Sequence, residues 1–260
     1  MNSTHFKQMA LLTLVILQNS CAENPFKTQS HDPAGDASLE AAQYHEALKD
    51  AAIVEDSDMT NQLLAVTREN PNLVWNEDKT RLLVVTWKGN SSYEDYIKST
   101  TKSSNNPNYA LWVTAAPQVQ AFCHRYLIDN PNATADQLNL RLKQYLGLPP
   151  VGNYDVFVEL WIKPDDMFRP CVDKEINDSQ CNKDIPPKFP AVANIPDYGA
   201  FYQNLYFTRF RSSSPYPWTG IGYTYDWGGS DSKVGASEFI LIPETSYEIK
   251  QTVATLDYCK

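Results

Sequence analysis

The chain has 260 residues, of which 22 are Lys or Arg and 31 are Asp or Glu, so its formal net charge is −9 near neutral pH. An acidic chain without a basic run is poorly suited to bind a phosphate backbone, so nucleic acid is excluded as an expected partner. The length is enough for one sizeable hydrophobic core, and no internal linker divides the body of the chain.

The N-terminal segment is typical of an export signal. Lys7 precedes a short apolar run at residues 9–17, which small and polar residues follow. Secretion signals have an apolar core of ~7–15 residues, whereas a helix that crosses a bilayer needs ~20. We therefore expect residues 1–22 to be a cleaved signal peptide, residues 23–37 to be a flexible tether and residues 38–260 to form one globular domain.

The cleavage site can be interpreted in two ways. Ser20 and Cys21, with the polar residues after them, resemble a bacterial lipoprotein signal, and this resemblance implies that Cys21 is lipidated and anchors the protein to a membrane. The triplet that ends at Ala22 also fits the small-x-small pattern of ordinary cleavage, which would remove Cys21 and release the protein. Both routes predict an exported protein, which is periplasmic, anchored to the outer membrane or secreted.

The first half of the predicted domain mixes helix and strand signals. Residues 38–52 have a helix-forming composition, rich in Leu, Ala and Glu. Three short segments with a β-branched and aromatic bias follow, and the first two are separated by a turn-like segment. We expect strands at residues 73–75, 82–87 and 109–114.

Two helices are predicted next. Pro117 begins the first, in which Val119 and Cys123 belong to an apolar stripe with helical spacing. Thr134 and Gln137 form a capping box, in which each side chain satisfies a backbone donor at the start of the second helix, residues 134–146.

The second half of the chain is richer in strand signals. Residues 154–162 are apolar on both faces, which predicts a central strand that carries Glu159. Residues 198–210 predict an aromatic helix, and short runs at 221–227, 237–242 and 247–255 predict strands. The expected class is α+β, with a mostly antiparallel sheet and two to four packed helices.

Cysteine usage agrees with export. Beyond Cys21 the chain has four cysteines, an even number that favours two disulfides in an oxidising compartment. Cys171 and Cys181 are the favoured local pair because the polar span between them has no apolar pattern to hold it. Cys123 would then pair with Cys259, although a buried free thiol at Cys123 is the alternative.

Catalytic and metal motifs are weak. After the signal, histidine occurs only at His31, His45 and His124, which nearly excludes a conventional nucleophile–histidine triad. His124 and Cys123 are neighbours on a helix and do not face one another, so they form no dyad. In one calcium-like loop, residues with side-chain oxygens occupy alternate positions, but the glycine that the calcium motif requires is missing. We therefore expect this segment to be a solvated acidic loop. We expect no bound metal and no cofactor. The residues of this loop are Asp173, Glu175, Asn177, Ser179 and Asp184.

An aromatic row is the best candidate working surface. Tyr223, Tyr225 and Trp227 occupy alternate positions, so a regular strand would project all three rings from one face, with Tyr216 and Trp218 just before them. Such a row can stack on sugar rings, and a glycan or another envelope polymer is the expected partner. Filling of the core is the alternative role for these rings.

Three functions are consistent with these features. The leading interpretation is a non-catalytic binding or structural module of the cell envelope that uses the aromatic row. A carboxylate-dependent glycan hydrolase is the second, with two of Glu159, Asp226 and Glu238 placed ~5–10 Å apart across a cleft. The third is a protein-partner adaptor that presents the outer face of the capped helix, which carries Arg141, Lys143 and Gln144.

The C-terminal part of the body has one loose resemblance. The segment 222–228, Gly-Tyr-Thr-Tyr-Asp-Trp-Gly, together with residues 237–239, resembles the C-terminal regions of exported bacterial proteins of unknown function. This resemblance implies export and implies no particular activity.

Overall fold

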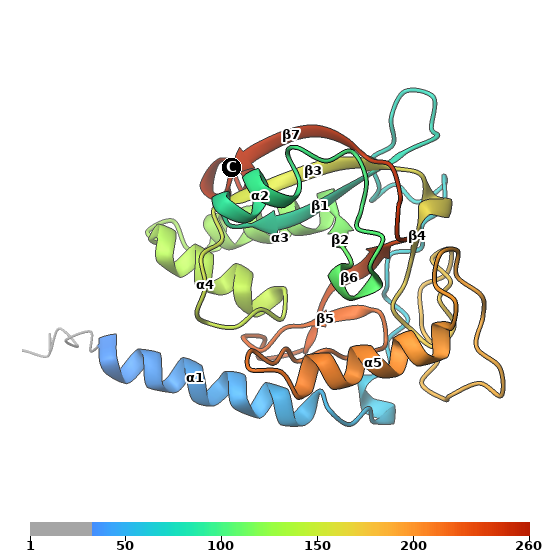
Figure 1. Cartoon of the computed structure of the whole chain (residues 1–260). Coiled ribbons are helices and arrows are strands. Elements are labelled where there is room, and N and C mark those ends of the chain that lie inside the picture. Colours follow the sequence, from blue (N-terminus) through green and yellow to red (C-terminus); the bar gives the residue numbers. More distant parts are fainter. Residues whose placement is uncertain (1–32) are drawn as a thin grey trace, which may run out of the picture.

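The computed structural model describes residues 33–260, so the predicted signal peptide, Cys21 and most of the predicted tether lie outside the described residues. The fold is α+β, as the sequence predicts, and is built on a seven-stranded antiparallel sheet (Figure 1). The strands follow the order β4-β6-β2-β1-β3-β7, and β5 pairs with β6 outside this path. Their bounds are Leu82–Lys88 (β1), Trp112–Ala115 (β2), Val156–Ile162 (β3), Met167–Phe168 (β4), Tyr223–Tyr225 (β5), Val234–Leu241 (β6) and Glu248–Ala254 (β7).

Six α-helices accompany the sheet in this range, and the two short ones were not expected from the sequence. The helices are Pro33–Asp50 (α1), Asn90–Tyr96 (α2), Ala116–Asp129 (α3), Ala135–Tyr145 (α4), Tyr198–Phe210 (α5) and Thr255–Tyr258 (α6). Within residues 33–260, no helix has the length and apolar character that a membrane crossing requires.

The two faces of the sheet are covered differently. Leu82, Val84 and Leu160 are completely buried on one face, where connecting segments rather than long helices cover them. On the other face, Val85 and Phe157 pack against α3 and α4. Because β1 and β3 are covered on both sides, their sequences are nearly continuous apolar runs.

The helical face of the sheet is covered in two separate places. The helices α3, α4 and α6 lie over β1 and β3, and Cys123 on α3 is bonded to Cys259, directly after α6. Helix α5 lies over β2 and β6, where Phe201 and Leu205 pack with Ile240. The space between these two groups of helices contains the candidate site described below.

The capped helix is confirmed in detail. Thr134 accepts a hydrogen bond from the backbone N–H of Gln137, and the Gln137 side chain accepts one from the backbone N–H of Thr134, at 3.2 and 2.9 Å. Leu138 and Leu142 then form the buried stripe of α4. The local pattern therefore fixed both the start of this helix and its buried face.

Helix α1 begins earlier than expected. It starts at Pro33 instead of Ser38, so residues 33–37 are helical and do not belong to a flexible tether. Proline is well tolerated in the first helical turn because its missing N–H would have no partner there. The helix lies at the lower edge of the molecule in Figure 1, and Tyr44 and Ala47 are buried on it, as is Ala51 directly after it.

Two predicted strands are shorter than expected. Residues 73–75 contribute only one isolated bridge, between Trp75 and Leu82, and the strand expected at 221–227 is limited to β5. A register shift between Tyr223 and Tyr225 interrupts the pairing of β5 with β6. Such an irregularity redirects side chains, which a strict alternation rule cannot anticipate.

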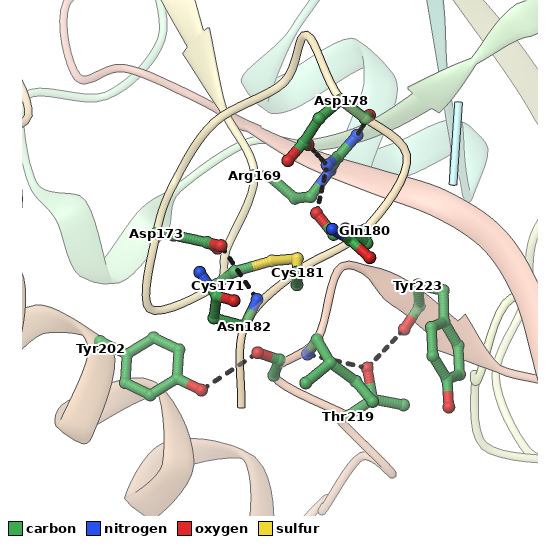
Figure 2. Close-up of a disulfide and its surroundings, with 12 residues drawn as sticks. Arg169, Cys171, Asp173, Asp178, Gln180, Cys181, Asn182, Tyr202, Thr219 and Tyr223 are labelled. Atoms are coloured by element: carbon green, nitrogen blue, oxygen red, sulfur yellow. Dashed lines mark hydrogen bonds and ion pairs between the residues drawn. A yellow bond between two sulfur atoms is a disulfide. The ribbon is translucent and has the colours of Figure 1, made fainter. Parts of the chain in front are cut away.

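A disulfide-closed loop surrounds a buried arginine (Figure 2). Cys171 and Cys181 are bonded, as predicted, and between them the chain turns around Arg169, whose side chain is 0% exposed. The Arg169 guanidinium donates to the carboxylate and carbonyl of Asp178 at 2.7 and 3.0 Å, and to the carbonyls of Gln180 and Leu64 at 3.2 and 3.0 Å. The loop therefore has an internal charged core in place of an apolar one.

Candidate functional site

The strands β1 and β2 separate at one end of the sheet. They pair only at Val84 with Ala115 and at Val85 with Thr114, whereas β1 stays paired with β3 as far as Lys88. β2 instead continues along β6, where Trp112 pairs with Ile240. The β2-facing edge of residues 86–88 consequently has no strand partner among the described elements.

A cavity of about 350 Å³ lies at this separation. Its size is near the lower end of the ~300–1,000 Å³ range of small-molecule sites. Strands β1, β2, β3 and β6 contribute to its walls, together with α5 and the segment 216–218. Eight aromatic residues line it: Trp87, Trp112, Tyr154, Phe157, Tyr216, Trp218, Tyr223 and Tyr225.

Glu238 is the carboxylate of this cavity. It lies on β6 directly opposite Thr114 of β2, is only 6% exposed, and its Oε1 atom has no hydrogen-bond partner. Burial raises the pKa of Glu238 to about 8, while Arg209 and the indole N–H of Trp218 act in the opposite direction. Within the described structure neither group forms an ion pair or a hydrogen bond of regular geometry with Glu238.

Arg209 is the first cation of the cavity. It lies near the C-terminal end of α5, and its guanidinium carbon is 4.8 Å from the ring centroid of Trp112 and 5.5 Å from that of Tyr216. Burial lowers the pKa of Arg209, and Glu238 opposes this shift. An arginine keeps its charge under ordinary conditions, so the cavity carries a permanent positive charge between two rings.

Lys88 is the second cation. It is the last residue of β1 and is half-buried at the point where the strands separate. Burial lowers the pKa of its ammonium group, and the charge of Arg209 lowers it further. No acidic residue contributes to this shift, so Lys88 has a cationic neighbour and no anionic one.

The predicted open aromatic row is not observed. Tyr223, Tyr225 and Trp227 are 2, 6 and 4% exposed, and their rings belong to two different core clusters. The Tyr225 hydroxyl donates to Asp50 of α1, and the Trp227 N–H donates to the carbonyl of Leu148. The three rings are therefore buried and do not form an exposed face, although Tyr223 and Tyr225 belong to the lining of the cavity.

The other two aromatic candidates line the same cavity as Tyr223 and Tyr225. Tyr216 is half-buried and Trp218 is 6% exposed, and both line the cavity between α5 and the sheet. The Nε1 atoms of Trp218 and of Trp112 have no hydrogen-bond partner. Buried indole N–H groups usually have an acceptor, so a polar guest in the cavity would supply what these two lack.

The three candidate catalytic carboxylates are not brought together. Asp226 forms a two-pronged ion pair with Arg141 at 2.8 and 2.7 Å, and Glu159 accepts from Lys250 and Gln251 at 2.8 Å each. Glu159 and Glu238 lie in one cross-strand row, three strand steps apart, so their backbones are about 14 Å apart. Of the three, only Glu238 lines the cavity.

The calcium-like loop does not form a cation site in the described structure. Asp173 accepts from the backbone N–H of Asn182 at 2.9 Å (Figure 2), and the carbonyl of Ser179 accepts from the N–H of Leu63. The described range contains one group of potential metal ligands, and two of its three members are the cysteines of the Cys171–Cys181 disulfide. The remaining loop candidates, Glu175, Asn177 and Asp184, are exposed.

The outer face of the capped helix is also occupied. Arg141 is paired with Asp226, Lys143 donates to the carbonyl of Pro150 at 2.9 Å, and the carbonyl of Gln144 accepts from the N–H of Trp227. The side chains of Arg141 and Lys143 therefore have partners within the protein, and Gln144 is bonded through its backbone carbonyl to the backbone N–H of Trp227. His124 is exposed, and its Nδ1 lies 3.1 Å from the carbonyl oxygen of Cys259.

Comparisons with known proteins give no guide to this site: no protein-family model, no curated protein and no solved structure matches the chain. Sequence analysis found Tyr216, Trp218 and Glu238 and noted no role for Lys88 or Trp112. Lys88 follows a buried strand without a nearby acid in the sequence, and this is the one local signal that could have drawn attention to it.

Proposed function

We propose that this protein is an exported, non-catalytic binding protein that holds a small organic molecule in the cavity beside Glu238. The proposed ligand-binding surface is the wall of this cavity, to which four of the five predicted aromatic residues belong: Tyr216, Trp218, Tyr223 and Tyr225. A small ring would meet aromatic side chains from the sheet and from the segment after α5.

One observation carries this proposal. Three buried polar atoms without a partner, Glu238 Oε1, Trp112 Nε1 and Trp218 Nε1, belong to side chains that line the same cavity. Leaving a buried polar group unsatisfied costs ~1–3 kcal/mol, and such groups are few in native proteins. Polar atoms of a guest molecule would recover this free energy on binding.

The hydrolase alternative has less support. It requires two cooperating carboxylates, and of the three candidates only Glu238 lines the cavity. The adaptor alternative has less support because Arg141 and Lys143 on that helix face have partners within the protein. A binding protein needs neither of these features.

The export part of the proposal is supported by the two disulfides, which fit an oxidising compartment. We propose that the leader directs the chain there and that Cys21 either carries a lipid anchor or is removed with the leader. Intact-mass measurement of the mature protein distinguishes these routes, because a lipidated protein keeps Cys21 and gains the mass of its acyl chains. A mature protein that still begins at residue 1 would contradict export.

The binding function can be tested with a naphthalene sulfonate dye and an NMR fragment set of ring compounds. Ala110 lines the cavity and is half-buried, so Ala110→Phe should fill part of the space and weaken binding of any guest by about tenfold. Ala121, exposed on α3, provides the matched control Ala121→Phe, which should leave binding unchanged. Absence of any ring compound that distinguishes these two variants would contradict the proposed function.

A further inference from the structure

The cavity contains more hydrogen-bond donors and positive charge than the protein itself can satisfy. Arg209 and Lys88 are its two cations, and neither forms an ion pair with an acid in the described range. Trp112 and Trp218 add two indole N–H groups that have no hydrogen-bond partner of regular geometry in the described structure, although the Trp218 N–H acts to lower the pKa of Glu238. Glu238 is the only carboxylate that lines the cavity.

We propose that the ligand of this cavity is a small aromatic acid, whose ring lies among the tryptophan and tyrosine side chains and whose carboxylate is held by Arg209 and Lys88. This inference rests on the proposed binding function and specifies the chemical class of its ligand.

The charge balance supports an anion. A buried cation without a counter-charge is costly, and a ligand carboxylate would compensate Arg209 in the geometry that guanidinium groups favour. Burial raises the pKa of Glu238 to about 8, so this side chain is mostly uncharged near neutral pH and does not compensate the cations. Arg209 therefore gives the cavity a positive charge, and a ligand carboxylate would also oppose the lowering of the Lys88 pKa that burial and Arg209 cause.

The shape and lining support a flat ring. Arg209 already lies over Trp112 and Tyr216, at 4.8 and 5.5 Å from the two ring centroids, so its guanidinium plane is fixed between aromatic side chains. Trp87 stacks on Tyr154 and on Phe157 with centroid separations of 4.7 and 5.4 Å, which forms a continuous aromatic wall at the β1 side. A ring that enters between these groups meets π faces on more than one side.

Glu238 adds a second polar contact at another part of the cavity. In its protonated form it can donate one hydrogen bond and accept another. A hydroxyl or ring N–H on the ligand would satisfy its unpartnered Oε1 atom. The favoured ligand therefore combines an acid group with a ring that carries one such substituent.

A cationic ligand is the opposite class, and the cavity disfavours it. An amine that approached Glu238 would be repelled by Arg209 and Lys88, and it would leave both indole N–H groups without acceptors. A neutral ring would fill the space but would leave the two cations uncompensated.

Three indole compounds of nearly equal size test the class directly: indole-3-acetate, its neutral amide and the cation tryptamine. Titration calorimetry with the full mature protein should show that the acetate binds at least about tenfold more tightly than the amide, since a hydrogen bond between charged groups contributes ~1.5–3 kcal/mol. Tryptamine should bind most weakly.

Variants identify the groups responsible. Arg209→Gln should reduce the affinity for the acetate about tenfold and change that for the amide much less, and Lys88→Gln should act in the same direction. Arg211→Gln is the matched control, because Arg211 is exposed just after α5 and does not line the cavity. If Arg209→Gln does not fold, as judged by its circular dichroism, Lys88→Gln carries the test.

The outcomes distinguish failure of the proposed ligand class from failure of the proposed binding function. Equal binding of acetate and amide, tightest binding of tryptamine, or an acid preference that survives in both cavity variants would overturn the inference and leave the proposed binding function standing. Binding of a naphthalene sulfonate dye without binding of any indole would also overturn it. If the screen finds no ring compound whose binding Ala110→Phe weakens, the proposed binding function and the inference are both contradicted.

Discussion

Arg141 of α4 and Asp226, directly after β5, form a two-pronged ion pair with N–O distances of 2.8 and 2.7 Å. The Asp226 side chain is 6% exposed and that of Arg141 is 20% exposed, and the guanidinium also lies 4.7 Å from the ring centroid of Phe122. The pair joins the capped helix to the C-terminal strands. Asp226 is therefore a structural residue and not a free acid or base.

Asp226→Asn should destabilise the protein by about 3 kcal/mol, near the lower end for a broken buried pair, because Arg141 retains some contact with water. Thermal unfolding followed by circular dichroism should show a midpoint lower by about 6–12 °C. Glu94→Gln, which breaks the exposed pair with Lys98, is the control and should cost less than ~1 kcal/mol. Similar losses in both variants would contradict the structural role of the Arg141–Asp226 pair.

Glu238 should make stability depend on pH. Its pKa in the folded protein is raised from 4.5 to about 8, so the folded state holds a proton that the unfolded state releases in this interval. The contribution of Glu238 to stability is therefore largest below pH 4.5 and declines as the pH rises to about 8, by at most ~1.4 kcal/mol per pH unit.

Urea unfolding of the wild type and of Glu238→Gln from pH 5 to pH 9 measures this contribution. The variant should gain stability relative to the wild type as the pH rises to about 8, and the difference should then level off. Glu248→Gln, at an exposed position of β7, should run parallel to the wild type. A constant difference between wild type and Glu238→Gln over this range would show that Glu238 does not hold its proton.

The two disulfides should differ in their contributions. The Cys123–Cys259 bond spans 136 residues and the Cys171–Cys181 bond spans 10, so chain entropy favours losses of about 5 and about 3 kcal/mol on removal. Urea unfolding of the double serine variants under non-reducing conditions gives both values. A larger loss for the short bridge would mean that the loop around Arg169 contributes more than the restraint on the unfolded chain.

Arg169→Lys should be severely destabilising despite the conserved charge. Lysine cannot reproduce the planar set of donors that reaches Asp178, Gln180 and Leu64, so buried acceptors would lose their partners. We expect a loss of about 3–5 kcal/mol in urea unfolding. Arg125→Lys, exposed on α3, should change stability by less than ~0.5 kcal/mol, and a similarly small effect at Arg169 would contradict the fully buried guanidinium.

Local sequence patterns predicted the elements whose cause is local. The capping box at Thr134 fixed the start of α4, and the aromatic helix at 198–210 has the predicted bounds. The apolar pattern of 154–162 correctly indicated a strand with neighbours on both sides, which β1 and β7 provide. Both disulfide pairings agree with the favoured prediction, which rested on the even number of cysteines and on a polar loop without a periodic apolar pattern.

The aromatic row shows where local reasoning failed. Aromatic residues do alternate along residues 223–227, but a regular strand does not continue through them. The strand β5 ends at Tyr225, and its pairing with β6 shifts register, so the three rings enter separate clusters. Tyr225 contacts Asp50 of α1, which lies 175 residues away in the chain. No pattern within seven residues can report whether a distant helix will cover it.

The sequence by itself determined the α+β composition, the capped helix and the pairing of the cysteines, because helix caps, apolar periodicity and covalent loop closure act over short stretches of chain. Tertiary structure alone decided the site. Lys88, Trp112, Arg209 and Glu238 come from four elements and share one cavity because β1 and β2 separate beyond Val85 while α5 covers the opposite side. Lys88 and Arg209 lack a counter-charge only because the cavity encloses them. On an exposed surface, water would satisfy the polar groups of all four side chains.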